Sequence, residues 1–173
     1  MVKVLICGDV NSEFELVLNR ITTLQNSSHG PFQVLFFSGT LFKNEAEFNQ
    51  IAPTLIFPMK AYSFDTTGVT ENVLSPESNL EFFNYTGVGL ATVSNLTVGF
   101  MNNSADGESV QDAKDICQLV GYRGCDLLFT ADWPRETHHF LDDSDISILR
   151  ETGVGLGIGS QEVSSFSTSL RPR

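Results

Sequence analysis

The sequence contains few cysteines and no long apolar run. Its three cysteines, Cys7, Cys117 and Cys125, lack the C-x-x-C pairing of zinc and redox sites, so we expect them to be small buried apolar residues. The longest apolar runs, such as Val34–Phe37, fall far short of the roughly 20 residues that span a bilayer. No contact with a membrane is therefore expected. The first residues also lack the pattern of a secretory signal, which predicts an intracellular protein.

Basic residues are also scarce. The 10 Lys and Arg residues stand against 21 Asp and Glu residues, which gives a formal charge of −11. This charge raises the electrostatic cost of approaching a phosphate backbone, so it disfavours nonspecific binding to nucleic acid. A basic protein partner suits such a surface, but the same charge also keeps a domain soluble. The composition leaves both interpretations open.

Apolar material is plentiful. The chain has 173 residues, of which 41% are hydrophobic and 14 are Phe. This length and composition predict one domain, residues 1–173, with a substantial core.

The first half of the chain predicts strands that alternate with helices. Short apolar runs that stop at glycine-containing turns are typical of buried strands, and apolar residues at three-four spacing are typical of a helix with one buried face. These patterns predict a central strand at 2–7, a helix from Glu13 to about Leu24 capped by Ser12, a buried strand at 34–37, a short helix at 44–50, and a strand region at 53–62 that is broken by Pro58.

The second half adds an antiparallel hairpin to this alternation. The same patterns predict a hairpin of strands 88–93 and 96–100 around Ser94-Asn95, a helix at 109–120, a strand at 126–130, a polar loop at 131–147 and a final helix at 161–170. Strands that alternate with helices, together with a hairpin, predict an α/β fold arranged as a layered sandwich.

Three short motifs suggest a nucleotide-binding or metal-binding site, but each departs from the pattern that such a site requires. The glycine-rich run 153–159 lacks the early position in a βαβ unit that a dinucleotide-binding loop requires, so we interpret it as a connection. The run 142–145 holds three aspartates but lacks the spaced ligands and terminal Glu of an EF-hand, which favours a solvated acidic loop. Neighbouring side chains such as His138 and His139 rarely converge on one metal.

Polar residues follow three of the predicted strands. They lie at Gly8–Asn11, Ser38–Thr40 and Thr130–Arg135. In open α/β sheets, functional groups gather beyond the carboxyl ends of the strands. We therefore expect these three strand ends to line one sheet edge and to form the pocket of the domain.

The three strand ends resemble those of the calcineurin-like metallophosphoesterase superfamily. Within this superfamily, three blocks of the sequence resemble the N-terminal domain of CwfJ-like proteins, which are relatives of the lariat debranching enzyme. The resemblance is carried by Val2–Val10 (V-K-V-L-I-C-G-D-V), Asp126–Pro134 (D-L-L-F-T-A-D-W-P) and Ser169–Arg173 (S-L-R-P-R). It implies a layered α/β sandwich of the metallophosphoesterase type, with mixed sheets and flanking helices. It also implies a nuclear protein in which C-terminal CwfJ domains follow this one.

The catalytic pattern of the superfamily is mostly lost at the matching positions. Asp9 matches the aspartate of the D-x-H motif, but Asn11 stands at its histidine and Thr40 at the aspartate of G-D. The G-N-H region would fall within 58–67, which contains neither Asn nor His. Ala131 stands where debranching enzymes have a histidine before D-W-P. The resemblance thus implies that the domain has no catalytic residue, no bound metal and no cofactor. It implies instead a vestigial pocket formed by Asp9, Asn11, Thr40, Asp65, Ala131, Asp132 and Arg135.

These losses predict a binding domain that has lost its catalytic activity. By resemblance, its partners are the lariat debranching enzyme or spliceosomal proteins, in spliceosome disassembly or intron-lariat turnover, and RNA is contacted only indirectly or through other domains. An alternative is an active phosphodiesterase or ribonuclease with one metal held by Asp9, Asn11, Asp65 and Asp132. That enzyme lacks an obvious general acid for the leaving group.

Two further interpretations remain. The chain is also compatible with an α/β binding domain unrelated to the superfamily. The D-W-P-R block has a structural interpretation as well, in which Trp133 packs under the loop, Pro134 fixes the course of the chain and Arg135 pairs with a nearby acid.

Overall fold

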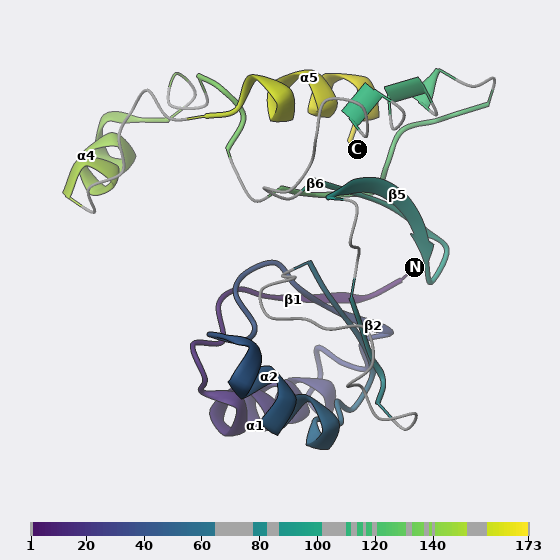
Figure 1. Ribbon diagram of the computed structural model, residues 1–173, viewed down its shortest axis with the longest axis vertical. Helices are drawn as coiled ribbons and strands as arrows, with labels where there is room; N and C mark the ends of the chain where they lie inside the picture. The colour runs from purple at the N-terminus through teal and green to yellow at the C-terminus, as the bar shows by residue number, and fades with distance from the viewer. Residues whose placement is uncertain are drawn as a thin grey trace. The chain divides into compact units, whose positions relative to one another are not determined.

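The computed structural model forms two compact units (Figure 1). The first unit comprises Met1–Tyr85 and Thr92–Leu96, and the second comprises Thr86–Ala91 and Thr97–Arg173. The structure describes residues 2–64, 78–82, 87–101, 110–111, 114–115, 117–118, 121–130, 133–136, 139, 141–151 and 159–172.

The first unit is built on a parallel sheet. Its strands are β1 (Val4–Cys7), β2 (Val34–Phe37), β3 (Lys60–Ser63) and β4 (Leu80–Phe82), in the spatial order β1-β2-β3-β4, and each neighbouring pair is parallel. All four residues of β2 are fully buried, as its uninterrupted apolar run predicts.

The prediction that the first strand is central is wrong for the sheet that the structure describes. β1 lies at one edge of this sheet, and Ile6 on this strand is 51% exposed. An apolar run indicates that the side chains of a strand meet other apolar groups. It does not indicate how many strands pair with its backbone, so the run alone does not separate a central strand from an edge strand.

Two helices of the first unit form where the spacing predicts them. α1 spans Phe14–Gln25 and α2 spans Glu45–Ile51, followed by a short 3-10 turn at Ala52–Thr54. Figure 1 shows both helices on the same side of the sheet. The predicted cap of the first helix is wrong, because Ser12 has a φ of +68° and Glu13 occupies the cap position without a side-chain bond. The side chain of Asn44 does cap α2 and accepts the backbone N–H of Glu47 at 3.0 Å.

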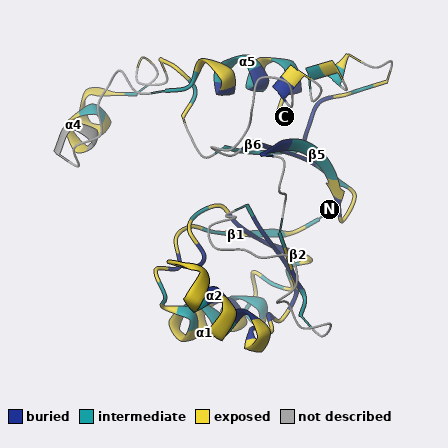
Figure 2. Cartoon of the chain, in the orientation of Figure 1, coloured by how far each residue is buried: buried dark blue, intermediate teal, exposed yellow. Residues whose placement is uncertain are grey.

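Phenylalanine rings fill the space between these helices and the sheet. Phe48 of α2 is fully buried and packs edge-on against Phe42, with 5.2 Å between ring centroids and 83° between planes. Its ring also lies 5.8 Å from that of Phe82 on β4. Phe37 of β2 contacts Phe57 at 5.2 Å. The buried residues of this core are dark blue in Figure 2.

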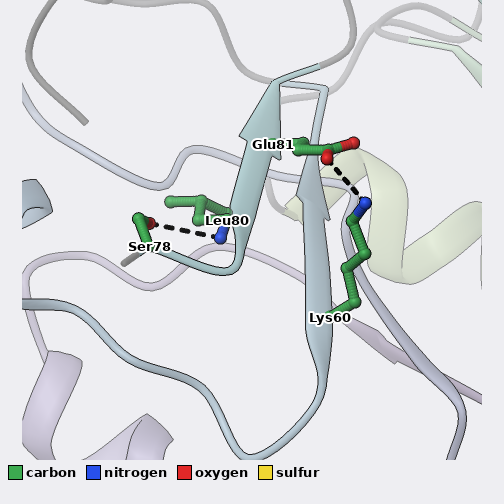
Figure 3. Close-up of polar contacts among 4 residues, drawn as sticks. All are labelled: Lys60, Ser78, Leu80 and Glu81. Carbon is green, nitrogen blue, oxygen red and sulfur yellow. Dashed lines mark hydrogen bonds and ion pairs between the residues drawn. The ribbon is translucent and has the colours of Figure 1, made fainter. Parts of the chain in front are cut away.

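Polar contacts at the surface of the sheet add little to its stability. The Lys60 ammonium lies 2.6 Å from the Glu81 carboxylate across β3 and β4, and this pair is drawn in Figure 3 together with the hydrogen bond from the Leu80 N–H to the Ser78 hydroxyl. Its hydrogen bond to Glu81 raises the pKa of Lys60. Both side chains of the ion pair are about half exposed, so water screens the pair.

A second, mixed sheet has the order β5-β6-β7 and is formed by β5 (Val88–Val93), β6 (Leu96–Met101) and β7 (Leu127–Thr130). Most of its residues belong to the second unit, whereas the hairpin tip Thr92–Leu96 belongs to the first. The predicted hairpin is confirmed: Ser94 and Asn95 have φ angles of +50° and +67°, as the tightest hairpin turns require. β6 and β7 are parallel.

A C-terminal helix packs against this second sheet. α5 spans Gln161–Leu170, as predicted, and buries Val163, Phe166 and Leu170. Leu170 lies so close to β6 that a Cβ on Gly99 would stand 2.7 Å from its Cδ1. A glycine at this position therefore lets the end of the helix approach the strand. Where the structure describes the predicted helix 109–120, at 110–111, 114–115 and 117, the backbone is helical.

The prediction of a loop at 131–147 is wrong at its end, because α4 spans Asp143–Glu151. The Asp142 carboxylate accepts the backbone N–H groups of Ser144 and Asp145, both at 3.0 Å, and so caps this helix. The Asp142 carboxylate also accepts a hydrogen bond from the Ser144 hydroxyl at 2.6 Å. This bond, followed by the backbone bonds, lowers the pKa of Asp142. A polar stretch with a capping aspartate has the composition of a loop, which is why the pattern misleads.

No helix in the described part of the chain has the length and apolar character that crossing a membrane demands.

Candidate functional site

The ends of β1 and β2 lie side by side, as the sequence predicts. Their parallel register pairs Cys7 with Phe37, so the residues that follow each strand meet at the same edge. The Asp9 carboxylate oxygen Oδ1 accepts the backbone N–H of Thr40 at 2.7 Å, and the N–H of Val10 donates to the Thr40 carbonyl at 3.0 Å. Asp9 therefore joins the two strand ends.

Gly39 makes this close approach possible. A Cβ at this position would lie 2.2 Å from Asp9 Oδ1 and 2.6 Å from the Asp9 backbone nitrogen. Both distances are far below van der Waals contact. By contrast, a Cβ on Gly8 would meet nothing within 4 Å. The sequence analysis did not identify Gly39 as a positioning residue, because its role depends on the neighbouring strand.

The chain turns sharply after Asp9. Asn11 is exposed and has a φ of +52°, which asparagine tolerates better than most residues. The turn is closed by a hydrogen bond from the N–H of Glu13 to the carbonyl of Val10 at 2.9 Å. Asn11, which the resemblance matches to the D-x-H histidine, thus lies on an exposed turn.

The third predicted strand end belongs to a different sheet. β7, which precedes residues 131–135, pairs with β6 in the second sheet, so the expectation that all three strand ends line one sheet edge is wrong. Asp65, Ala131 and Asp132 lie outside the described residues. The vestigial pocket as a complete set stays a prediction, of which the structure brings together Asp9 and Thr40.

The backbone of residues 133–135 is fixed against the start of α5. The Trp133 carbonyl accepts the N–H of Ser160 at 2.8 Å, and the N–H of Arg135 donates to the Ser160 carbonyl at 3.2 Å and to the Ser164 hydroxyl at 2.7 Å. Gly159 permits this contact, because a Cβ there would stand 2.6 Å from the Arg135 Cα. Residues 133–135 are thus joined to the helix mainly through their backbone.

The side chains of this block depart from their structural interpretation. Trp133 is 56% exposed and does not pack under the loop. The guanidinium of Arg135 makes a long hydrogen bond, 3.5 Å, to the side-chain oxygen of Gln161, which is an amide and not the predicted acid. Both side chains are therefore exposed at the surface.

Ser160 caps this helix, and the sequence analysis missed its role. Its hydroxyl accepts the N–H of Val163 at 3.1 Å and donates to the Glu162 carboxylate at 2.9 Å. The backbone N–H of Glu162 and the Ser160 hydroxyl lower the pKa of Glu162. A serine directly before the predicted helix is the signal that identifies such a cap.

The cysteine thiols are fully or partly buried, which disfavours their reactive thiolate form. Cys125 is fully buried, as predicted, whereas Cys7 and Cys117 are partly buried, and burial raises the pKa of all three thiols. Within the ranges that the structure describes, no three His, Cys, Asp or Glu side chains gather around a common point. His138 and the glycine run up to Ile158 lie outside those ranges.

Comparison with known proteins finds clear relatives. No protein-family model matches the chain. The chain is 31% identical over 151 residues to the CWF19-like protein 1 homolog of Caenorhabditis elegans, which covers 78% of this chain and 28% of that protein. It is 25% and 26% identical over 193 residues to CWF19-like protein 1 of Mus musculus and Homo sapiens, covering 99% of this chain and 34% of each of those proteins. The chain thus spans about a third of the length of the curated relatives it matches.

Proposed function

Because the chain belongs to the CWF19-like family, to which it is homologous over nearly its whole length at 22–31% identity, we propose that it is a catalytically degenerate metallophosphoesterase-like domain. Its task is to bind proteins within a splicing-associated factor. The larger part of the relatives' length lies outside this chain, so the activity of the whole protein also belongs to this proposal.

The proposed partners are the lariat debranching enzyme or spliceosomal proteins. The domain would act in the nucleus, in spliceosome disassembly or intron-lariat turnover, and would assist lariat debranching. The formal charge of −11 supports contacts with protein rather than direct contact with RNA. RNA would reach the factor indirectly or through other domains.

The observation that carries the proposal is the role of Asp9. In a two-metal site, clustered carboxylates and imidazoles hold the ions that activate water. Here one oxygen of Asp9 accepts the Thr40 N–H at 2.7 Å. The neighbouring positions that would supply further ligands hold Asn11 and Thr40. Asp9 therefore links two strands, and neither Asn11 nor Thr40 provides an imidazole or a second carboxylate.

The fold agrees with this proposal at a coarse level. Parallel strands with helices and a smaller mixed sheet form an α/β architecture, and the specific metallophosphoesterase arrangement is part of what we propose. Asn11 and Thr40 offer neutral oxygen atoms, which are weak ligands for a hard cation compared with carboxylates. These replacements support a degenerate domain.

A binding assay with purified lariat debranching enzyme tests the proposal. The immobilised domain is expected to bind the enzyme saturably, and an Asp9→Asn variant is expected to bind equally well, because Asn keeps an oxygen acceptor for the Thr40 N–H. A domain that binds neither debranching enzyme nor spliceosomal proteins, but cleaves branched RNA in an Asp9-dependent manner, would establish the single-metal enzyme instead.

A further inference from the structure

We draw no further inference here: the strongest candidate, the exposed side chain of Trp133 on the segment 133–136 that is hydrogen-bonded to the start of α5, carries none because nothing in the structure shows what covers it.

Discussion

Substitution of Gly39 by alanine tests how the two strand ends at Asp9 are held together. The added Cβ would lie 2.2 Å from Asp9 Oδ1, 2.6 Å from the Asp9 nitrogen and 2.9 Å from the Gly8 carbonyl carbon. The carboxylate can rotate away, but then it loses its bond to the Thr40 N–H. The two backbone atoms can move only if the strand end shifts.

The expected cost follows from these contacts. Overpacking costs about 1–3 kcal/mol. Loss of the hydrogen bond that the exposed Asp9 carboxylate accepts from the Thr40 N–H adds about 1 kcal/mol. Alanine also lowers the conformational entropy of the unfolded chain, which offsets the cost by about 0.4–1 kcal/mol. We therefore expect Gly39→Ala to lower the free energy of unfolding by about 1–3.5 kcal/mol, measured by urea denaturation and circular dichroism.

Gly8→Ala is the matched control. Its Cβ would meet nothing within 4 Å, so this variant should be as stable as wild type or more stable by up to about 1 kcal/mol. In a double-mutant cycle, Asp9→Ala should reduce the cost of Gly39→Ala, because the shortest of the three contacts disappears. A Gly39→Ala variant as stable as Gly8→Ala would refute the proposed packing of the strand ends.

Three further results are expected. Phe48→Ala, which removes a fully buried ring between two other phenylalanines, should destabilise the domain by about 3–5 kcal/mol in the same urea assay; a loss below about 1 kcal/mol would contradict the core described. Ser160→Ala should cost about 1 kcal/mol, because the N–H of Val163 loses its cap, and Ser160→Asp should restore most of it. Burial, followed by the nearby Cys117 thiol, raises the pKa of Tyr122, so the folded state keeps a proton that the unfolded state loses above about pH 10. Stability should accordingly fall as pH rises through that range, and the fall should be shallower in Tyr122→Phe when unfolding is followed at several pH values.

Local patterns predicted most of the regular structure. β2, the hairpin at Ser94-Asn95 and α5 were predicted correctly, because each is determined by residues within a short window. A buried parallel strand requires a continuous apolar run, and a two-residue hairpin requires residues that adopt positive φ. The tertiary environment adds little to these requirements.

Other features depend on contacts between distant residues, and the sequence predicted them poorly. β1 lies at the edge of its described sheet because of the strand order, which its own apolar run does not encode. Gly39 and Gly159 leave room for segments that are distant in the sequence, at Asp9 and at Arg135 respectively. Their roles become clear only when the chain folds and those segments meet. Asp142 caps a helix whose first turn is as polar as a loop.

The candidate site was predicted in part. Asp9 and Thr40 were expected to meet at neighbouring strand ends, and they do so through a hydrogen bond. Trp133 was expected to be buried but is exposed, because backbone bonds to Ser160 hold its segment without using the indole. Hydrophobicity indicates that a side chain gains from burial, and it does not distinguish burial in the core from burial by a partner.

Calorimetric titration of the complete chain with Mn²⁺, followed by an assay on a generic phosphodiester and on branched RNA, tests the central claim most directly. A degenerate domain in which Asp9 joins two strands is expected to take up no stoichiometric metal and to hydrolyse neither substrate. Stoichiometric uptake that is lost in Asp9→Asn, together with hydrolysis that depends on Asp9, would contradict the claim and show that the site retains catalytic chemistry.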